Sequence, residues 1–414
     1  NAEVLTDGYQ TQAKLVLNNA IIDGATVRGE YPRSEPIEIV NSTIIDSVIN
    51  SESYNYGISV KNSSVTNTIF KMGCCGANIN LEKSILTSCT FQEGGGSPVN
   101  GPLIIVQSEL INVGICLTSA ATTISNSTIS YDNLYNPNFS SGSCNSSTKI
   151  KIGNGTMSYS SLKGNGTSAG LDISGYNGYG SNGTFAITYS DITQNGTGIL
   201  LSGGSGSFSM TNSNLSNNSI YNMENKKTIN VTATNNYWGT TVASEIGATI
   251  FDYYDDINYG QVNYSPYLTS PDTDAPISPP TGLTATAGFG TISLSWSANP
   301  ESDTAGYKVY WDTDSGHPYA NVVDVGNATN YTITGLAAGT YYVAVTAYDT
   351  TATSVTDDPN TIVNEKQTAG NESWYAEKTV QYQYTLTVTK SGPGSGTVTS
   401  SPAGINCGTD CTEP

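Results

Sequence analysis

Charged side chains and histidine are scarce in this sequence. Only 12% of its 414 residues are Asp, Glu, Lys or Arg, and His317 is the single histidine. Acidic residues outnumber basic ones by 34 to 15, which gives a net charge of −19. Such a chain is poorly suited to bind nucleic acid or an anionic membrane through phosphate groups, and we expect neither partner. With one histidine and no Cys-x-x-Cys-His sequence, covalent haem is excluded and a histidine-based zinc site is not expected.

Long apolar runs are also missing. No stretch approaches the roughly 18 apolar residues of a membrane-spanning helix, so no membrane span is expected. No signal peptide is visible either, and the sequence reads as a mature or excised segment. No segment shows the sustained apolar period of 3.6 residues that marks an amphipathic helix. These absences favour an all-β protein.

Ten short segments share one pattern. Each has an apolar residue, two further residues, an Asn or Ser that we call the anchor, one residue, and a second apolar residue. Successive anchors lie 19 to 33 residues apart. A repeat of this size indicates a solenoid, in which each repeat buries its apolar side only by stacking on its neighbours. The anchors are Asn19, Ser42, Ser63, Ser84, Ser108, Ser127, Ser160, Ser190, Ser213 and Asn236.

The composition of the repeats distinguishes two kinds of solenoid. About 22 residues rich in Ile, Val, Thr, Ser and Asn fit three short strands and three turns, which is one coil of a parallel β-helix. A leucine-rich repeat would need several Leu at fixed positions, whereas these segments use Ile, Val, Leu and Met interchangeably. Asn often precedes the anchor, and this predicts a ladder of stacked side-chain amides along the axis. These residues are Asn18, Asn41, Asn62, Asn126, Asn212 and Asn235.

The last repeat carries a family resemblance. The segments 235–240, 250–256 and 262–268 resemble the closing coil of right-handed parallel β-helix repeat proteins of the pectate-lyase-like, surface-protein type. The resemblance covers roughly residues 10–268. It implies a right-handed parallel β-helix of about ten coils, which we place at residues 1–269. It does not decide function, because this solenoid serves both enzymes and inert scaffolds.

A second module follows a Pro-rich linker at residues 270–280. Alternating strands separated by turn signals predict a β-sandwich over 281–381. Its residues closely resemble a fibronectin type III domain, which implies that Trp296 is the core tryptophan and Tyr342 the tyrosine-corner residue. A long polar insertion at 350–369 departs from that family. The final segment, 382–414, resembles the start of a small bacterial surface repeat.

Seven cysteines in a chain of this type favour an extracellular location. Cys89 either pairs with one of the vicinal Cys74 and Cys75 or is a buried small apolar residue, and burial is the alternative for Cys116 as well. The predicted disulfides are Cys407–Cys411 in the tail and Cys116–Cys144 across the first long insertion.

Two insertions into the solenoid are candidates for binding. They lie at 131–149 and roughly 165–183, where the anchor spacing rises to 33 and 30 residues. Their aromatic side chains stand among Gly, Asn and Ser, which suits sugar stacking or protein contact unless these rings pack on the solenoid itself. The predicted binding residues are Tyr131, Tyr135, Phe139, Tyr176 and Tyr179.

Carboxylates are the other candidates. Lyases and glycosidases of this fold need clustered carboxylates, whereas the acids of these repeats are scattered in phase, and we predict no catalytic residue. The densest group is Asp252, Asp255 and Asp256 in the closing coil. Either it is structural or it binds Ca²⁺ with help from Asp272 and Asp274. No other cofactor is expected.

Together these features predict an extracellular bacterial or archaeal surface protein with a structural or adhesive role. No amphipathic segment caps the first coil and the last module looks unfinished, so self-association into a filament or surface layer is one expectation. Other surface proteins and glycans are the remaining candidate partners. The rival predictions are a polysaccharide lyase or hydrolase, and a module that binds polysaccharide without turnover.

Overall fold

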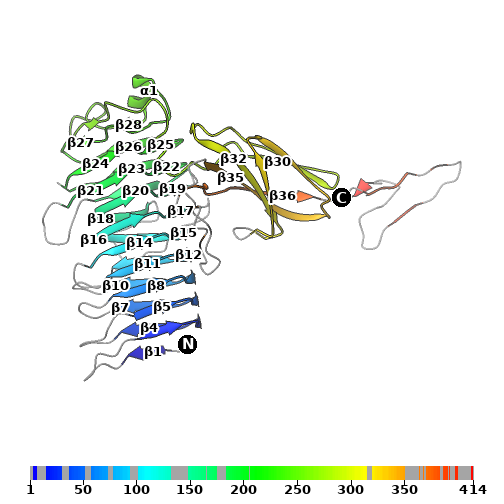
Figure 1. The fold of residues 1–414 in the computed structure, drawn as a ribbon, viewed down its shortest axis with the longest axis horizontal. Helices are drawn as coiled ribbons and strands as arrows, with labels where there is room; N and C mark the ends of the chain where they lie inside the picture. The colour runs from blue at the N-terminus through cyan, green and yellow to red at the C-terminus, as the bar shows by residue number, and fades with distance from the viewer. Residues whose placement is uncertain are drawn as a thin grey trace. The chain divides into compact units, whose positions relative to one another are not determined.

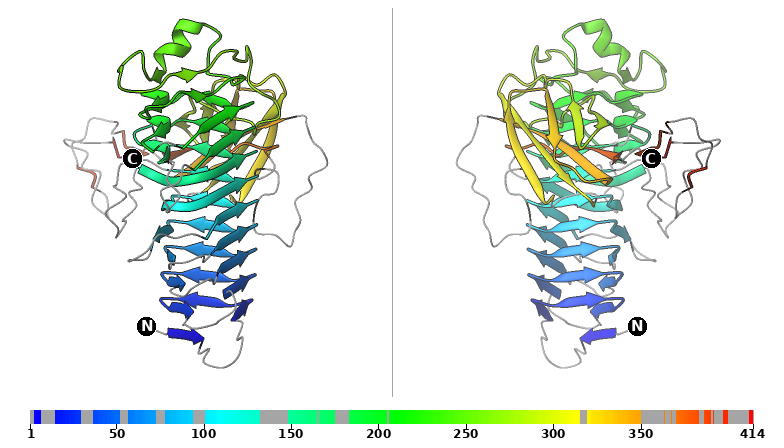
Figure 2. Two further views of the ribbon diagram at one scale, coloured as in Figure 1. Left: turned by 90° about the vertical axis from the view of Figure 1, so that its left-hand side faces the viewer. Right: turned by 90° about the vertical axis from the view of Figure 1, so that its right-hand side faces the viewer.

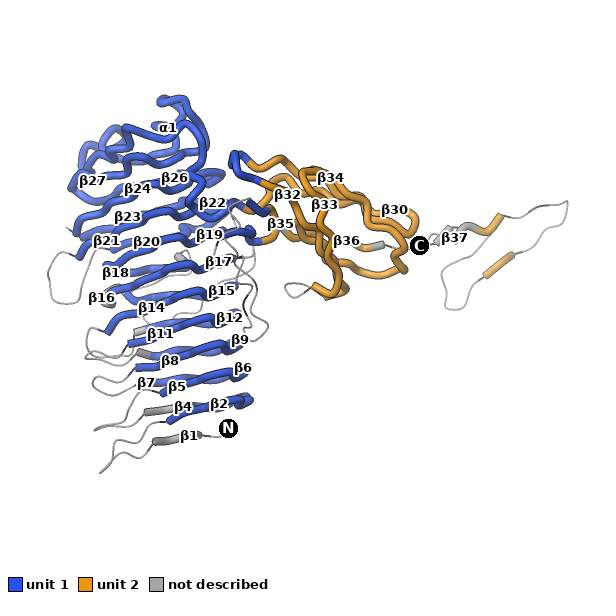
Figure 3. The backbone as a smooth tube through the Cα atoms, in the orientation of Figure 1, with its two compact units in different colours: residues 1–278, 300–304, 348–374 blue, residues 279–299, 305–347, 375–414 orange. Residues whose placement is uncertain are grey.

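The fold is seen in a computed structural model of the chain. The structure describes residues 3–6, 15–29, 37–51, 57–72, 78–93, 101–131, 148–164, 166–174, 183–204, 206–314, 319–349, 363, 367, 370–382, 386–389, 391, 397–399 and 412–413. The chain forms two compact units, coloured separately in Figure 3. Unit 1 comprises residues 1–278, 300–304 and 348–374, and unit 2 comprises 279–299, 305–347 and 375–414.

Unit 1 is a parallel β-solenoid of about eight turns, close to the predicted ten coils (Figures 1 and 2). Each coil contributes up to three strands, and equivalent strands of successive coils pair in parallel. The strands make three faces, which we number in the order in which the chain passes through them. The predicted all-β solenoid is therefore confirmed.

The strands of each face are short and in register. Face 1 consists of β2 (Val16–Asn18), β5 (Ile37–Val40), β8 (Ile58–Lys61), β11 (Ile79–Glu82), β14 (Leu103–Val106), β16 (Gly114–Ser125), β18 (Thr148–Ser158), β21 (Phe185–Thr188), β24 (Phe208–Thr211), β27 (Val231–Thr232) and β29 (Val262–Asn263). Face 2 consists of β3 (Ile21–Asp23), β6 (Thr43–Ile45), β9 (Ser64–Thr66), β12 (Ile85–Thr87), β15 (Glu109–Ile111), β17 (Thr128–Ser130), β19 (Ser161–Lys163), β22 (Asp191–Thr193) and β25 (Asn214–Ser216). Face 3 consists of β1 (Glu3–Thr6), β4 (Thr26–Gly29), β7 (Val48–Ser51), β10 (Ile69–Met72), β13 (Thr90–Glu93), the first parts of β16 and β18, β20 (Ala169–Ile173), β23 (Thr197–Leu201), β26 (Tyr221–Asn225) and β28 (Ile250–Phe251).

Two long strands, β16 and β18, run through face 3 and on into face 1. The continuous chain brings Gly155 of β18 against Thr122 of β16, where an added Cβ would lie 1.8 Å from the Thr122 carbonyl oxygen. Gly155 also has a φ of 136°. Only glycine fits this close approach of two backbones. A glycine is therefore required at the point where β18 passes from face 3 to face 1.

The core is formed by one inward residue from each coil of face 2 and by matching residues of the other faces. These face 2 side chains are at most 8% exposed. From Ile44 onward they stand two positions after the predicted anchors, so the apolar part of the repeat pattern is confirmed from the second coil onward. The inward residues of face 2 and its continuation are Ile22, Ile44, Val65, Leu86, Leu110, Ile129, Leu162, Ile192, Leu215 and Trp238.

The first coil departs from the predicted register by one residue. Ala20, not Asn19, stands at the anchor position, because its backbone N–H donates to the Ser42 hydroxyl at 3.1 Å. Val16 and Ile21, which the pattern placed inside, are 47% and 80% exposed. The error has a simple cause: both residues belong to apolar pairs, and the inward member of each pair is the second one.

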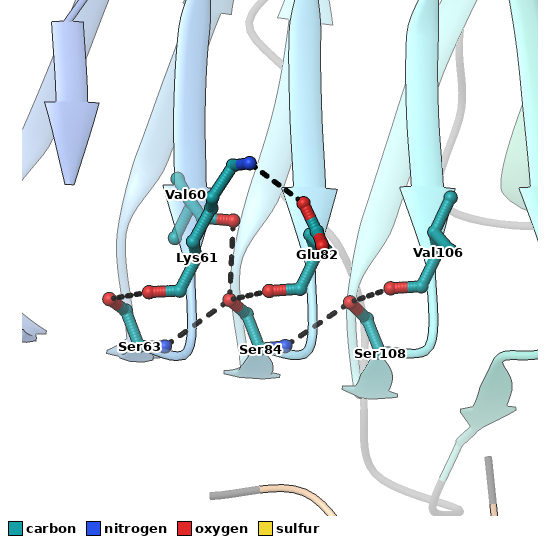
Figure 4. Close-up of polar contacts among 7 residues, drawn as sticks. All are labelled: Val60, Lys61, Ser63, Glu82, Ser84, Val106 and Ser108. Carbon is teal, nitrogen blue, oxygen red and sulfur yellow. Dashed lines mark hydrogen bonds and ion pairs between the residues drawn. The ribbon is translucent and has the colours of Figure 1, made fainter. Parts of the chain in front are cut away.

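The anchor serines form a hydrogen-bonded ladder inside the turn between faces 1 and 2 (Figure 4). Each backbone N–H donates to the anchor oxygen of the next coil at 3.0–3.4 Å, from Ala20 through to Asn236. Each serine hydroxyl from Ser42 to Ser213 donates to the carbonyl two residues earlier at 2.7–3.0 Å. The ladder thus pairs the buried polar groups of every turn, and explains why the anchor is Ser.

A second column flanks this ladder on the outside of the same turn. Its residues have a left-handed backbone, with φ between 45° and 58°. Asn62 donates its side-chain amide to Asn41 at 2.8 Å, and Asn41 donates to Asn18, which precedes the left-handed Asn19, at 3.4 Å. The predicted amide ladder is therefore seen over the first three coils. Higher up, Tyr159 and Tyr189 replace the amides and stack with ring centroids 4.9 Å apart. At these two coils an aromatic stack takes the place of the amide bonds.

Unit 2 contains two antiparallel sheets, as expected for a fibronectin type III sandwich. Trp296 is buried, whereas the tyrosine-corner bond is made by Tyr341, whose hydroxyl donates to the Ala337 carbonyl at 3.2 Å, and not by Tyr342. The first sheet contains β30 (Thr284–Gly288), β31 (Thr291–Ser295) and β34 (Asn330–Thr334). The second contains β33 (Asn321–Gly326), β32 (Thr304–Asp312), β35 (Gly339–Asp349) and β36 (Ala376–Tyr382). A separate hairpin pairs β37 (Leu386–Thr387) with β38 (Thr412–Glu413).

One helix completes the described elements. It is α1 (Ala243–Ala248), which contributes buried Ile246 to the end of the solenoid core. In the part of the chain that the structure describes, no helix has the length and apolar character of a membrane span.

Candidate functional site

The predicted binding aromatics can be judged at one position. Tyr131 is 5% exposed and donates its hydroxyl to the Val113 carbonyl at 2.7 Å. Its expected place on an exposed, ligand-binding loop is therefore wrong, because the ring belongs to the solenoid core. Tyr135, Phe139, Tyr176 and Tyr179 lie outside the described residues.

The predicted calcium group in the closing coil consists of turn residues. Both carboxylate oxygens of Asp252 accept backbone N–H groups, from Tyr254 at 3.0 Å and from Val262 at 2.7 Å. Asp255 accepts the N–H of Asp252 at 3.1 Å, and Asp256 accepts from Asn258. Across the described ranges, no three His, Cys, Asp or Glu side chains are grouped to hold a metal ion. The geometry favours the structural alternative for these acids.

Two of the predicted disulfide cysteines, Cys89 and Cys116, lie in the described part of the chain. Cys89 is fully buried and forms no disulfide, so its predicted pairing with Cys74 or Cys75 is wrong and the alternative of a buried small residue holds. It occupies the position held by Ser47 and Thr68 in the two preceding coils and contacts the same kind of carbonyl oxygen, that of Thr87 at 3.3 Å. Cys116 is buried and disulfide-bonded. Its predicted partner Cys144, and the predicted pair Cys407–Cys411, lie outside the described residues.

The outer surface of face 2 carries the feature that the sequence did not predict. On its first four strands the outward side chains are half-buried or exposed, and Ile21 is 80% exposed. On its last five strands most outward side chains are polar and almost fully buried. We call the outward positions of β3, β6, β9 and β12 the open half, and those of β15, β17, β19, β22 and β25 the covered half. The buried residues of the covered half are Glu109, Thr128, Ser130, Ser161, Asp191, Thr193, Asn214 and Ser216, none more than 6% exposed.

Residues 272–278 of the linker cover part of this surface. The backbone N–H of Asp272 donates to Oδ1 of Asn214 at 2.8 Å, and the Asn214 amide donates to the Asp272 carbonyl at 3.2 Å. One coil earlier, Ser278 reaches Asp191, with its Oγ 3.2 Å from Oδ1. The linker is therefore hydrogen-bonded to two adjacent strands, β22 and β25.

Ser278 joins two buried acids. Its Oγ contacts Oε1 of Glu301 as well as Asp191, and its backbone N–H donates to the same Glu301 oxygen at 2.9 Å. Asp191 is fully buried and Glu301 is 5% exposed. Within the described part of the chain, Oδ2 of Asp191 meets no hydrogen-bond partner, and neither do the neighbouring hydroxyls of Ser161 and Thr193.

The environment of Asp191 favours its neutral form. Burial raises the pKa of Asp191 well above its ordinary value, the negative charge of Glu301 raises it further, and the Ser278 hydroxyl opposes the shift. Burial and the Glu301 charge also raise the pKa of the Tyr237 phenol, which stands one coil above Asn214. The cluster is thus a buried acid pair rather than an ion pair.

A second polar group lies on the outer surface of face 3. Asp172 is 3% exposed, accepts a hydrogen bond from the Ser202 hydroxyl, and lies 3.5 Å from Nζ of Lys151. Burial raises the pKa of Asp172, while Ser202 and Lys151 lower it. Two coils above in the same column, Glu224 pairs with Lys226 at 2.7 Å.

Comparisons with known proteins identify one part of the chain. The fibronectin type III domain model matches residues 278–359, so the match ends within the polar insertion. A solved Fn3-like protein from Clostridium thermocellum is 30% identical over 27% of this chain and 97% of its own, with a TM-score of 0.20. The spore cortex lytic enzyme SleM of Clostridium perfringens is 22% identical over 26% of this chain, with a TM-score of 0.18.

This chain spans 29% of the length of the lytic enzyme, and neither TM-score supports an argument about function. No curated protein sequence matches the chain significantly. What is established is a parallel β-solenoid joined to a fibronectin type III domain at residues 278–359.

Proposed function

We propose that this protein is an extracellular structural or adhesive surface protein, which associates with copies of itself or with other surface proteins. The observation that carries the proposal is the open half of face 2. Over four coils, its outward positions are Ile, Thr and Ser, with Asp23 as the single charged residue. Because such a surface carries almost no charged side chains, little free energy is needed to remove water from it when another protein binds.

The polar groups of the solenoid support a scaffold role. The anchor serines are committed to the turn ladder, and Asp252 is committed to backbone N–H groups. Asp172 is held by Ser202 and Lys151. Side chains used in this way hold coils together rather than meet a substrate.

Light scattering after size exclusion, together with negative-stain microscopy, tests self-association. We expect oligomers or filaments whose amount rises with concentration. Ile45→Lys places a charge at the centre of the open half and should reduce association, whereas Thr232→Lys, on exposed face 1, should not. A clean monomer at high concentration, or equal effects of the two variants, would contradict assembly through this surface. Binding to isolated cell-surface fractions then distinguishes adhesion to other proteins.

The second candidate is a polysaccharide-binding or polysaccharide-degrading protein. It is favoured by the column on face 3, where Asp172 and Glu224 stand two coils apart and lysines pair with both. Carboxylates about 6–10 Å apart are the arrangement of inverting glycosidases. A glycan array tests binding, and reducing-sugar and unsaturated-uronide assays with Ca²⁺ test turnover. Turnover that is lost in Asp172→Asn and retained in Glu38→Gln would establish the enzyme instead of the scaffold.

A further inference from the structure

The contacts among Ser278, Asp191 and Glu301 need more hydrogen atoms than the Ser278 hydroxyl supplies. A serine hydroxyl has one hydrogen to donate. Its oxygen lies against a carboxyl oxygen on each side, that of Asp191 at 3.2 Å and that of Glu301 at shorter range. If both acids were ionised, one of the two contacts would be a repulsion between oxygen lone pairs. A hydrogen must therefore come from one of the acids.

The backbone shows which acid is ionised. Oε1 of Glu301 receives the Ser278 N–H at 2.9 Å in addition to the Ser278 hydroxyl. Two donors on one oxygen stabilise a carboxylate. The remaining lone pairs of the Ser278 hydroxyl face Asp191, which must then act as a donor. Asp191 is also the more deeply buried acid, at 0% exposure against 5% for Glu301.

We propose that Asp191 is protonated and donates to Ser278, which donates to the Glu301 carboxylate, and that this proton fastens residues 272–278 and 300–304 to the covered half of face 2. The attachment is therefore sensitive to pH. At low pH the three-residue chain is complete. When Asp191 loses its proton, two buried carboxylates face one hydroxyl, and the attachment weakens.

The direction of the pH effect follows from the pKa shift. The pKa of Asp191 is raised in the folded protein by burial and by the charge of Glu301. A raised carboxyl pKa contributes stability below the unfolded value of about 3.9, and that contribution is lost as pH rises through the folded value. Between the ordinary carboxyl pKa and the raised folded pKa, the ratio of attached to detached linker should fall about tenfold per pH unit, and above the folded pKa it should level off.

Further acids lie in the two segments that attach beside Asp191. Burial raises the pKa of both Asp272 and Asp303, which lie in the two attached segments, and the charge of Asp274 raises both further. Their ionisation adds negative charge to the same surface as pH rises. Glu301 is the charged group that acts on Asp191. The other titratable groups on the elements packed around it are Asp303 of residues 300–304, Asp272 and Asp274 of the linker, Tyr237 of the next coil, and Lys163 of β19, in register with Thr193.

A bound cation is the competing explanation for two buried acids. Calcium takes six to eight oxygen ligands, usually including several carboxylates. Among the described residues, no group of three acids is placed to hold a metal ion. Moreover, the Ser278 N–H points at Glu301, and a positive N–H dipole beside a cation would be unfavourable. A proton satisfies the same oxygens without further ligands.

Hydrogen–deuterium exchange of the full chain, followed by mass spectrometry from acidic to alkaline pH, tests the proposal. Protection factors are compared for peptides that cover 272–278 and 300–304, with the peptide 57–72 of the open half as reference. Protection of the two attached segments should fall with rising pH, while the reference peptide keeps its protection. Equal behaviour of all three peptides would overturn the proposal.

Variants separate the proton from other causes. Asp191→Asn keeps an N–H donor toward Ser278 at every pH, so protection should persist into the alkaline range. Glu301→Gln removes the neighbouring charge and should move the loss of protection to a different pH, whereas Asp23→Asn, an exposed acid of the same sheet, should change nothing. If Asp191→Asn lost protection at the same pH as the wild type, the proposal would be wrong. Protection that depended on added Ca²⁺ or on EDTA would assign the site to a cation instead.

Discussion

The open and covered halves of face 2 are built alike inside and differently outside. Leu86, the inward residue of β12 behind the open half, and Leu162, the inward residue of β19 behind the covered half, are both fully buried, and the same serine ladder runs beside both. On the outer side, Ser64 of the open half is half-buried, whereas Asn214 in the same column is 2% exposed and bonded to the linker. The repeat thus specifies the solenoid, and deviations at its outward positions specify what attaches to it.

The largest expected loss of stability comes from truncating inward leucines, and it should be similar behind both halves. Leu86→Ala and Leu162→Ala each remove a fully buried side chain, and each should lower the free energy of unfolding by about 2–5 kcal/mol. Urea denaturation followed by circular dichroism measures this. A loss confined to one half would mean that the two interiors are not equivalent.

The next largest effect, from truncating outward polar residues, should differ between the two halves. Asn214→Ala removes the partner of the Asp272 backbone and leaves buried groups unpaired, which should cost about 1–3 kcal/mol and expose the linker to proteases. Ser64→Ala, in the same column of the open half, should change stability by less than about 0.5 kcal/mol. Comparable losses in these two variants would show that the open half is covered as well.

Tyr131 provides a smaller test, at the point where the covered half meets the first insertion. Tyr131→Phe removes one buried hydrogen bond to Val113 and should cost about 1 kcal/mol. Because the ring is buried, binding to glycans or surface proteins should be unchanged. A variant of full stability that lost binding would restore Tyr131 as a ligand residue.

Cys89 lies in the coil just before the covered half. Its replacement should have the smallest effect on the free energy of unfolding. Burial raises the pKa of its thiol to about 12, so it should not react with thiol reagents at neutral pH until the solenoid unfolds. Cys89→Ser continues the hydroxyl column of Ser47 and Thr68 and should change stability by less than about 1 kcal/mol. Site-resolved labelling by mass spectrometry checks the first expectation, and rapid labelling of the native thiol would contradict it.

The interior of the solenoid could be predicted because its signal is local and repeated. An apolar residue at a fixed distance from each anchor is enough to place Ile44, Leu86 or Leu162 inside. The first coil was misplaced by one residue because Val16-Leu17 and Ile21-Ile22 satisfy the pattern in either register. The anchor serines were recognised, but their ladder of backbone bonds depends on turn geometry that the sequence does not state.

The covered half could not be predicted from the repeat. Asp191 meets Ser278, which is 87 residues away in sequence, and Asn214 meets Asp272 at a separation of 58. No local sequence pattern predicts contacts between residues so far apart in the chain. A signal was nevertheless present: acids and amides at Glu109, Asp191 and Asn214 interrupt a column that elsewhere holds Thr, Ser and Ile. The acids of the closing coil misled because clustered carboxylates can cap a turn as readily as they bind Ca²⁺.

The difference between the two halves is tested most directly by site-resolved cysteine labelling. Thr43→Cys and Ser64→Cys report on the open half, and Thr128→Cys and Ser161→Cys on the covered half. The account predicts that the first two thiols, at half-buried positions, react in the native protein, and that the last two react only after unfolding. Equal labelling of all four thiols in the native protein would contradict it.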